Sequence, residues 1–99
     1  MLLTSFPAGP LAANCYVVAR GPGTGCAVVD PGMDAMGSLR QVVREQNLTP
    51  RAVLITHGHF DHMADAPELA KMHNAPIWAP AGLSQSLAML GVVPANQAL

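Results

Sequence analysis

A continuous apolar strand between two amphipathic helical patterns most strongly constrains what this chain can fold into. The run "RAVLIT" at 51–56 contains consecutive apolar residues, which is typical of a strand buried on both faces of a sheet. Apolar residues recur at helical spacing before it, from Asp34 to Gln46, and after it, from Asp61 or His62 to His73. Because strands that alternate with helices pack in layers, the pattern predicts an α/β fold, a mixed sheet with flanking helices.

Further strands are predicted on either side of this unit, at 1–6, 14–19, 26–30 and 75–79. Pro/Gly turns separate the first three, so we expect these three to form a meander. Helices are expected near 35–46, 63–73 and 81–90. Asp34 and Asp61 are the candidate N-caps of the first two helices. Pro67 is tolerated in the second helix if that helix begins near residue 65; an earlier start would kink it.

Length and charge limit the classes of protein that this chain can belong to. A chain of 99 residues forms at most one domain with one modest core. It is 51% hydrophobic and 11% charged, whereas a typical soluble domain is about 25% charged. We therefore expect some of its apolar surface to pack against a part that this sequence does not contain. The net charge is −1 and the five basic residues are scattered, which excludes the basic stripe of a nucleic-acid binder.

The N-terminal segment and the cysteines predict a cytoplasmic protein. No basic residue precedes Arg20, and Pro7 and Pro10 interrupt the apolar run, so the segment fits neither a signal peptide nor a transmembrane span. Cys15 and Cys26 lack CxxC spacing and fall in neighbouring predicted strands. We expect buried, reduced thiols, because a cytosolic chain seldom keeps a disulfide.

Three of the four histidines and one of the four aspartates lie within seven residues, in "THGHFDH" at 56–62. Imidazole nitrogens and carboxylate oxygens are ligands that zinc and similar divalent ions accept. The first two histidines flank the flexible Gly58 and can converge on one ion, while the adjacent Asp and His can address a second position. The alternative interpretation is a polar loop whose histidines cap a helix and meet solvent. The candidate ligands are His57, His59, Asp61 and His62, whereas a surface or capping role is expected for His73.

The motif "THGHFDH" resembles the signature of the metallo-β-lactamase superfamily. The stretches "VVDPG" at 28–32, "NCYVV" at 14–18 and "NLTPRAVLITHGHFDH" resemble its glyoxalase II (hydroxyacylglutathione hydrolase) branch, over about residues 11 to 79. The resemblance implies a metallo-β-lactamase-like αββα sandwich. Residues 1–99 would supply only the amino-terminal half of that domain, apparently truncated.

The resemblance also assigns roles to particular residues. His57 and His59 match two ligands of a first metal, and Asp61 and His62 match two ligands of a second. Asp30 matches an acidic residue that supports the site from behind, although the residues alone favour a turn position before Pro-Gly. In the complete enzyme, two Zn²⁺ ions, or iron or manganese, would bridge a water and aim the hydroxide at the carbonyl of a small-molecule thioester or ester such as S-lactoylglutathione. Asp61 would be the catalytic residue, since it would hold the second metal and also accept the hydrogen bond of that water.

The sequence departs from the family where further ligands are expected. Two histidines and a bridging aspartate would lie farther along the chain, but no histidine, aspartate or glutamate follows His73. The chain is therefore either a fragment of a longer hydrolase or a short relative that cannot work alone, and its activity as an enzyme stays open. The alternative function is a non-catalytic module that binds metal weakly, or that packs against the missing carboxyl-terminal half or another chain.

Overall fold

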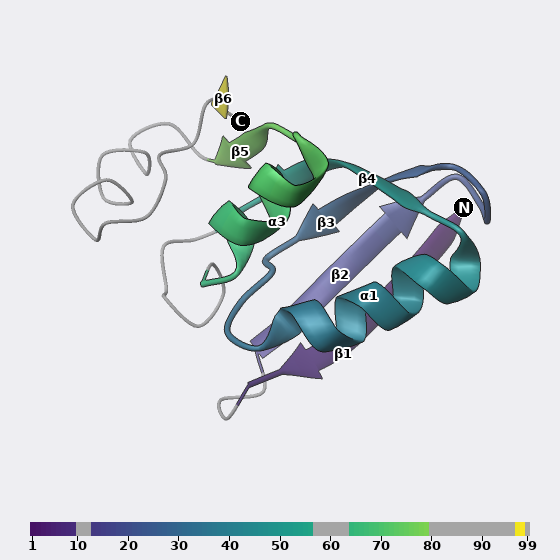
Figure 1. Cartoon of the computed structure of the whole chain (residues 1–99), viewed down its shortest axis with the longest axis horizontal. Coiled ribbons are helices and arrows are strands. Elements are labelled where there is room, and N and C mark those ends of the chain that lie inside the picture. The colour runs from purple at the N-terminus through teal and green to yellow at the C-terminus, as the bar shows by residue number, and fades with distance from the viewer. Residues whose placement is uncertain (10–12, 57–63, 80–96, 99) are drawn as a thin grey trace.

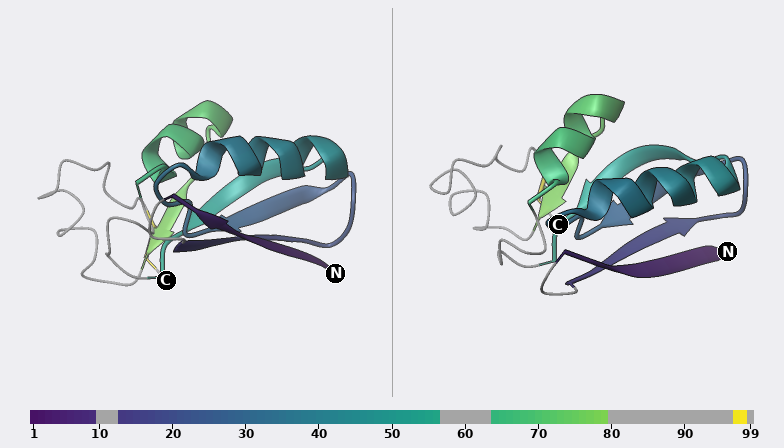
Figure 2. Two further views of the ribbon diagram at one scale, coloured as in Figure 1. Left: turned by 90° about the horizontal axis from the view of Figure 1, so that it is seen from below. Right: turned by 60° about the horizontal axis from the view of Figure 1, so that its bottom comes forward.

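A computed structural model of the chain describes residues 1–9, 13–56, 64–79 and 97–98. Among these residues, helices α1 and α3 lie over one face of a single six-stranded sheet (Figures 1 and 2). The strand order β1-β2-β3-β4-β5-β6 follows the order of the chain. The bounds are Leu2–Ala8 for β1, Ala13–Ala19 for β2, Gly25–Val29 for β3, Ala35–Gln46 for α1, Thr49–Leu54 for β4, Ala66–His73 for α3, Ile77–Ala79 for β5 and Gln97–Ala98 for β6.

The sheet is mixed, as the sequence predicts. Strands β1, β2 and β3 pair antiparallel as a meander, and β3, β4, β5 and β6 pair parallel. Parallel neighbours require a crossover, and α1 supplies it between β3 and β4 while α3 lies between β4 and β5. The carboxyl ends of β3 and β4 therefore lie side by side at one end of the sheet. Ligands of open α/β sheets bind at such ends, so this is where a site is expected.

Strand β1 ends later and strand β4 begins earlier than predicted, and both extensions include a proline. Strand β1 continues through Pro7 to Ala8, because β1 is an edge strand and can accommodate a residue that lacks an N–H. Strand β4 begins at Thr49, and Pro50 pairs with Cys26 near the start of the strand. The sequence does not predict the two-residue β6, and the helix predicted at 81–90 lies outside the described residues.

The helix boundaries confirm one expected N-terminus and correct the other. Helix α1 follows Asp34 as predicted, but Asp34 has φ 61° and its side chain makes no capping hydrogen bond. Helix α3 begins at Ala66 and is preceded by Asp65, so Asp61 as the cap of this helix is wrong. The late start places Pro67 in the first turn, where a missing N–H costs nothing.

The core lies between the sheet and the two helices. Side chains alternate along β2 and β3, so that every second residue faces α1 and α3. Burying one such apolar side chain completely is worth about 1.5 to 3 kcal/mol relative to leaving it exposed. The largest fully buried side chains are Leu39, Ile55, Leu69, Val17, Val28, Val53, Pro31, Pro50 and Cys15.

Neither α1 nor α3 covers the opposite face of the sheet, called here the outer face (Figure 2). Leu3 on β1 and Tyr16 on β2 belong to it and are 60% and 37% exposed. Val18, Ala27 and Leu54 on neighbouring strands are partly exposed. An apolar surface of this kind on a small protein usually marks an interaction site. No helix among the described residues is both long enough and apolar enough to cross a membrane.

Candidate metal centre

The candidate ligands His57, His59, Asp61 and His62 lie outside the described residues. Their convergence on one pocket therefore stays a prediction. In the part of the chain that the structure describes, no three His, Cys, Asp or Glu side chains gather closely enough to hold a metal ion. What the structure does show is how the residues on either side of this segment are held.

Buried Asp30 holds the residue that directly precedes the segment. Its Oδ1 accepts a hydrogen bond from the Thr56 backbone N–H at 2.8 Å, and its Oδ2 accepts one from the Thr56 hydroxyl at 2.6 Å. Asp30 is only 4% exposed, and burying a carboxylate is costly unless hydrogen bonds compensate it. The two bonds from Thr56 contribute that compensation. They fix the position at which the chain leaves β4 toward His57.

The backbone at Asp30 explains why an aspartate suits this position. Asp30 directly follows β3 and has φ 54°, a left-handed conformation that aspartate adopts more readily than most residues. Its own N–H donates to the carbonyl of Leu54 at 2.8 Å, which continues the pairing of β3 with β4 by one residue. The sequence analysis names Asp30 as a supporting residue through resemblance alone. The structure adds Thr56 as its partner, which the sequence analysis missed.

Asp65 lies just beyond the other end of the segment and joins three elements. Its N–H donates to the carbonyl of Pro31 at 2.9 Å, and its Oδ2 accepts a hydrogen bond from the backbone N–H of Met36 at 3.2 Å. These two hydrogen bonds are called here the Asp65 clasp. The carbonyl of Asp65 also accepts the N–H of Leu69 at 3.1 Å, in the first turns of α3. Asp65 precedes α3 in the chain, yet its side chain caps α1.

The sequence contains a signal for Asp65 that the analysis above did not use. In "DAPE" at 65–68, an aspartate precedes a helical pattern, a proline follows two residues later and a glutamate three residues later. This order is typical of a helix N-terminus. The signal predicts the start of α3 correctly. It does not predict that the carboxylate bonds to a different helix, because that contact depends on the tertiary fold.

Burial raises the pKa of the Asp65 carboxyl above its ordinary value. The negative charge of Glu68 adds to this rise, and so, more weakly, does that of Asp34. The N–H groups of Met36 and Ala35 oppose it, because they stabilise the charged form, but they do not cancel the effect of burial. The first turn of α1 is a favourable place for a negative charge, since its N–H groups have no partners within the helix.

Both cysteines are buried free thiols, as the sequence predicts. Burial raises the pKa of Cys15 to about 12, and the charges of Asp30 and Asp65 contribute to the rise. Burial also raises the pKa of Cys26. A thiol is nucleophilic and binds metal mainly as the thiolate, so neither cysteine is a reactive group or a ready metal ligand.

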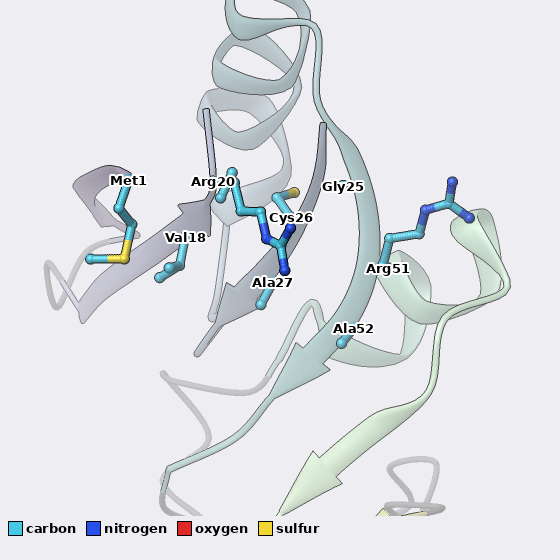
Figure 3. A pocket seen from close by; sticks show the side chains of 9 residues that line it. Met1, Val18, Arg20, Gly25, Cys26, Ala27, Arg51 and Ala52 are labelled. Carbon is cyan, nitrogen blue, oxygen red and sulfur yellow. The ribbon is translucent and has the colours of Figure 1, made fainter. Parts of the chain in front are cut away.

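A hollow and a groove lie away from the carboxyl ends of β3 and β4. A hollow of about 620 Å³ opens where β3 and β4 begin, and Arg20 and Arg51 contribute to its lining (Figure 3). A groove of about 230 Å³ runs between α1 and α3, with Leu39 and Leu69 among its lining residues and His73 at its side. His73 is the last residue of α3 and is partly exposed, which confirms its placement at the surface.

The sequence matches the metallo-beta-lactamase superfamily over residues 8–99, and the chain belongs to this superfamily. The fold agrees with this assignment. The chain resembles the crystal structure of the BLEG-1 B3 metallo-beta-lactamase with a TM-score of 0.82 at 27% sequence identity. The likeness covers 99% of this chain and 53% of that protein.

Curated relatives of the chain are considerably longer. An uncharacterized protein of Mycobacterium tuberculosis is 51% identical over 78 residues, which are 79% of this chain and 35% of that protein. The probable metallo-hydrolase YqgX of Bacillus subtilis is 35% identical over 72 residues, which are 73% of this chain and 33% of that protein. The chain therefore spans about a third of the length of these relatives.

Proposed function

We propose that this chain is the amino-terminal part of a metal-dependent hydrolase, and that the complete protein cleaves thioesters of the hydroxyacylglutathione type. The observation that carries the proposal is the position of "THGHFDH". Its first residue, Thr56, lies at the carboxyl end of a parallel strand and is bonded to the buried carboxylate of Asp30. Membership of the superfamily and the name of the Bacillus relative support hydrolysis as the class of reaction.

The donor atoms of the motif fit divalent metal ions. We propose two Zn²⁺ ions in the complete site, the first held by His57 and His59 and the second by Asp61 and His62. Iron and manganese also accept these nitrogen and oxygen donors. Bound ions would lower the pKa of a coordinated water toward 7 and polarise the substrate carbonyl. Asp61 would accept a hydrogen bond from the attacking water, and the buried carboxylate after β3 would keep the start of the ligand segment in place.

The complete protein would supply the groups that this chain lacks. Since no histidine, aspartate or glutamate follows His73, the remaining ligands would come from segments outside 1–99. We propose that such segments pack on the apolar outer face, where Leu3 and Tyr16 are exposed. The substrate would be a small-molecule thioester or ester. The proposal includes a cytoplasmic location and no partnership with nucleic acid or membrane.

A non-catalytic module is the second candidate. This candidate applies if the protein has no metal ligands beyond His57, His59, Asp61 and His62. With an incomplete ligand set, it would bind metal weakly or pack against another chain. This candidate predicts no hydrolysis even when the missing segments of a longer relative are supplied in trans.

Calorimetric titration with Zn²⁺ tests the site itself. We expect weak binding by the 99-residue chain, because fewer protein ligands hold each ion than in a complete site. Binding should weaken further below about pH 6, where protons compete for the imidazoles. His59→Ala should abolish it, whereas His73→Ala, the matched control, should leave it unchanged.

Two results would contradict this assignment. Equal losses from His59→Ala and His73→Ala would show that the ligands are misplaced. Sub-micromolar stoichiometric binding, or turnover of a thioester by the monomeric chain, would show that the site is complete without further segments.

A further inference from the structure

The residues on both sides of the candidate ligand segment, 57–63, are bonded to one short stretch of chain. Thr56 donates two hydrogen bonds to Asp30, at 2.8 and 2.6 Å. Asp65 bonds to Pro31 at 2.9 Å and to Met36 at 3.2 Å. The three partners belong to the connection in which β3 passes into α1. The described residues that flank the proposed ligands on each side, Thr56 and Asp65, are thus both bonded to residues 30–36.

We propose that Asp65 is a positioning residue for the metal centre, and that its clasp sets the geometry of the ligand segment from the carboxyl end. This inference rests on the proposed function, in which the ligands are His57, His59, Asp61 and His62. Asp65 contributes no donor to the ion. It acts through the backbone, by holding the residue after the ligand segment against Pro31 and the start of α1.

The physical reason is the entropy of the segment. A chain segment whose two ends are fixed samples fewer conformations than one that is fixed at one end only, and any ordering that accompanies ion binding costs entropy. Fixing both ends before the ion arrives removes part of that cost and raises the affinity. Asp30 alone fixes only one end. Asp65 fixes the other through groups of both its backbone and its side chain.

Among the described residues, the side chain of Asp65 supplies a capping hydrogen bond at the start of α1. Asp34, the residue before α1, makes no capping hydrogen bond, so the N-terminus of this helix uses Asp65 instead. The acceptor is the Oδ2 oxygen, and an asparagine presents an equivalent oxygen to the same N–H. Asp65→Asn should therefore keep the clasp, whereas Asp65→Ala should lose its side-chain half.

Zn²⁺ titration of the 99-residue chain, followed by calorimetry, tests the proposal. We expect Asp65→Ala to weaken Zn²⁺ binding about tenfold, at the low end of the range for residues that orient ligands indirectly. Asp65→Asn should restore the affinity to within about twofold of the wild type, because it retains the hydrogen-bond acceptor. Val43→Ala, which removes partly buried apolar packing seven residues after Met36 on α1, is the control for lost stability.

A second pair of variants breaks the same bond from the other side and covers the case in which Asp65→Ala does not fold. Met36→Pro removes the donating N–H in the first turn of α1, where proline is tolerated. Met36→Ala keeps the N–H and removes only the side chain. Met36→Pro should weaken Zn²⁺ binding severalfold more than Met36→Ala.

The outcomes separate this proposal from the proposed function. If the wild type binds no Zn²⁺, the proposed function fails and this proposal fails with it. If the wild type binds Zn²⁺ and either Asp65→Ala or Met36→Pro leaves the affinity unchanged relative to its partner variant, the positioning role alone is overturned. A loss from Val43→Ala as large as that from Asp65→Ala would also overturn it, since general destabilisation would then explain both.

Discussion

Asp30 and Asp34 occupy the same left-handed region of backbone conformation, with φ 54° and 61°, but their side chains differ in what they bind. Only Asp30 is buried and bonded to Thr56, while Asp34 makes no capping bond. We expect Asp30→Gly to lower the free energy of unfolding by about 1 to 3 kcal/mol, because the Thr56 N–H loses its acceptor. Asp34→Gly should be neutral or slightly stabilising, since glycine adopts positive φ freely.

Urea unfolding of the two variants measures this difference. The pair is matched in residue type and in backbone conformation, so the comparison isolates the side-chain bonds. A loss from Asp34→Gly equal to that from Asp30→Gly would show that backbone conformation, and not the bonds to Thr56, decides the cost.

Thiol chemistry gives a second prediction at the scale of the residue. Because the pKa of Cys15 is raised to about 12 and that of Cys26 is also raised, both remain thiols at pH 8 in the folded protein. We expect neither to react quickly with a disulfide reagent under native conditions, and both to react once the chain is unfolded in urea. Rapid native labelling of Cys15 would contradict its complete burial in the fold.

Substituting alanine for two of the glycines should change the free energy of unfolding in opposite directions. Gly9, just after β1, has φ 70°, and an added Cβ would lie 2.8 Å from the carbonyl oxygen of Met33. Gly37 lies within α1, and an added Cβ there would meet nothing within 4 Å. We expect Gly37→Ala to stabilise the protein by about 0.5 to 1 kcal/mol through helix propensity. Gly9→Ala should destabilise it by at least 1 kcal/mol or so through strain and overlap.

Thermal and urea unfolding of both alanine variants provide the measurement. The sign of each change is the decisive quantity, because it depends on backbone conformation and local space at each glycine. If Gly9→Ala raised the free energy of unfolding, the turn after β1 would be misassigned.

The partly buried carboxyl of Asp65 makes the free energy of unfolding depend on pH. Because the pKa of Asp65 is higher in the folded chain than in the unfolded chain, the folded state binds this proton more tightly. The associated stability is fully present below the ordinary pKa of aspartate, about 4, and is lost as pH rises through the raised value. We expect Asp65→Asn to remove this loss, so that it gains stability relative to the wild type as pH rises from 4 toward neutrality.

The difference between the urea midpoints of wild type and Asp65→Asn, followed against pH, isolates this carboxyl from the others. Glu68→Gln is a second variant to measure, because the charge of Glu68 contributes to the raised pKa of Asp65. Removing that charge should lower this pKa toward its ordinary value and so reduce the range of pH over which stability changes. A difference that stays constant over this range would show that Asp65 titrates alike in both states.

Strand and helix patterns could be predicted wherever they depend on local sequence. Apolar runs and helical spacing predicted the mixed sheet, the meander and α1 within a few residues. The start of α3 was misplaced because Asp61 offers the same cap chemistry as Asp65, and only the fold decides between them. The bonds of Asp65 to Pro31 and Met36 join positions about thirty residues apart, so no local pattern predicts them. The residue types at 57–62 are enough to predict metal ligands, whereas the geometry of these ligands stays a prediction.

At the scale of the whole molecule, the outer face should govern self-association. Leu3 and Tyr16 leave apolar surface exposed there, whereas Met72, 49% exposed on α3, is an apolar residue on the helical side. We expect the 99-residue chain to associate as its concentration rises, because burying this surface removes it from water. The double variant Leu3→Lys, Tyr16→Lys should remain monomeric. Met72→Lys, the matched control, should associate as the wild type does.

Sedimentation velocity across a wide range of concentration checks this expectation. A wild-type chain that stays monomeric throughout would show that the outer face does not drive contact between copies. An equal effect from Met72→Lys would place the contact on the helical side instead.

The strand order of the sheet has a consequence for how the chain folds. Among the strands that the structure describes, each pairs with the one that precedes it in the sequence, so none of them has to insert between two earlier ones. The meander of β1, β2 and β3 can form from short loops alone, and the crossovers that contain α1 and α3 then add β4 and β5 at the growing edge. Contacts within the meander join near neighbours in sequence and require little loop closure, whereas the parallel pairs β3–β4 and β4–β5 require closure over a whole crossover and are expected to form more slowly. During synthesis, every strand that emerges from the ribosome already finds its partner in place, and the sheet can grow in the order in which the chain is made.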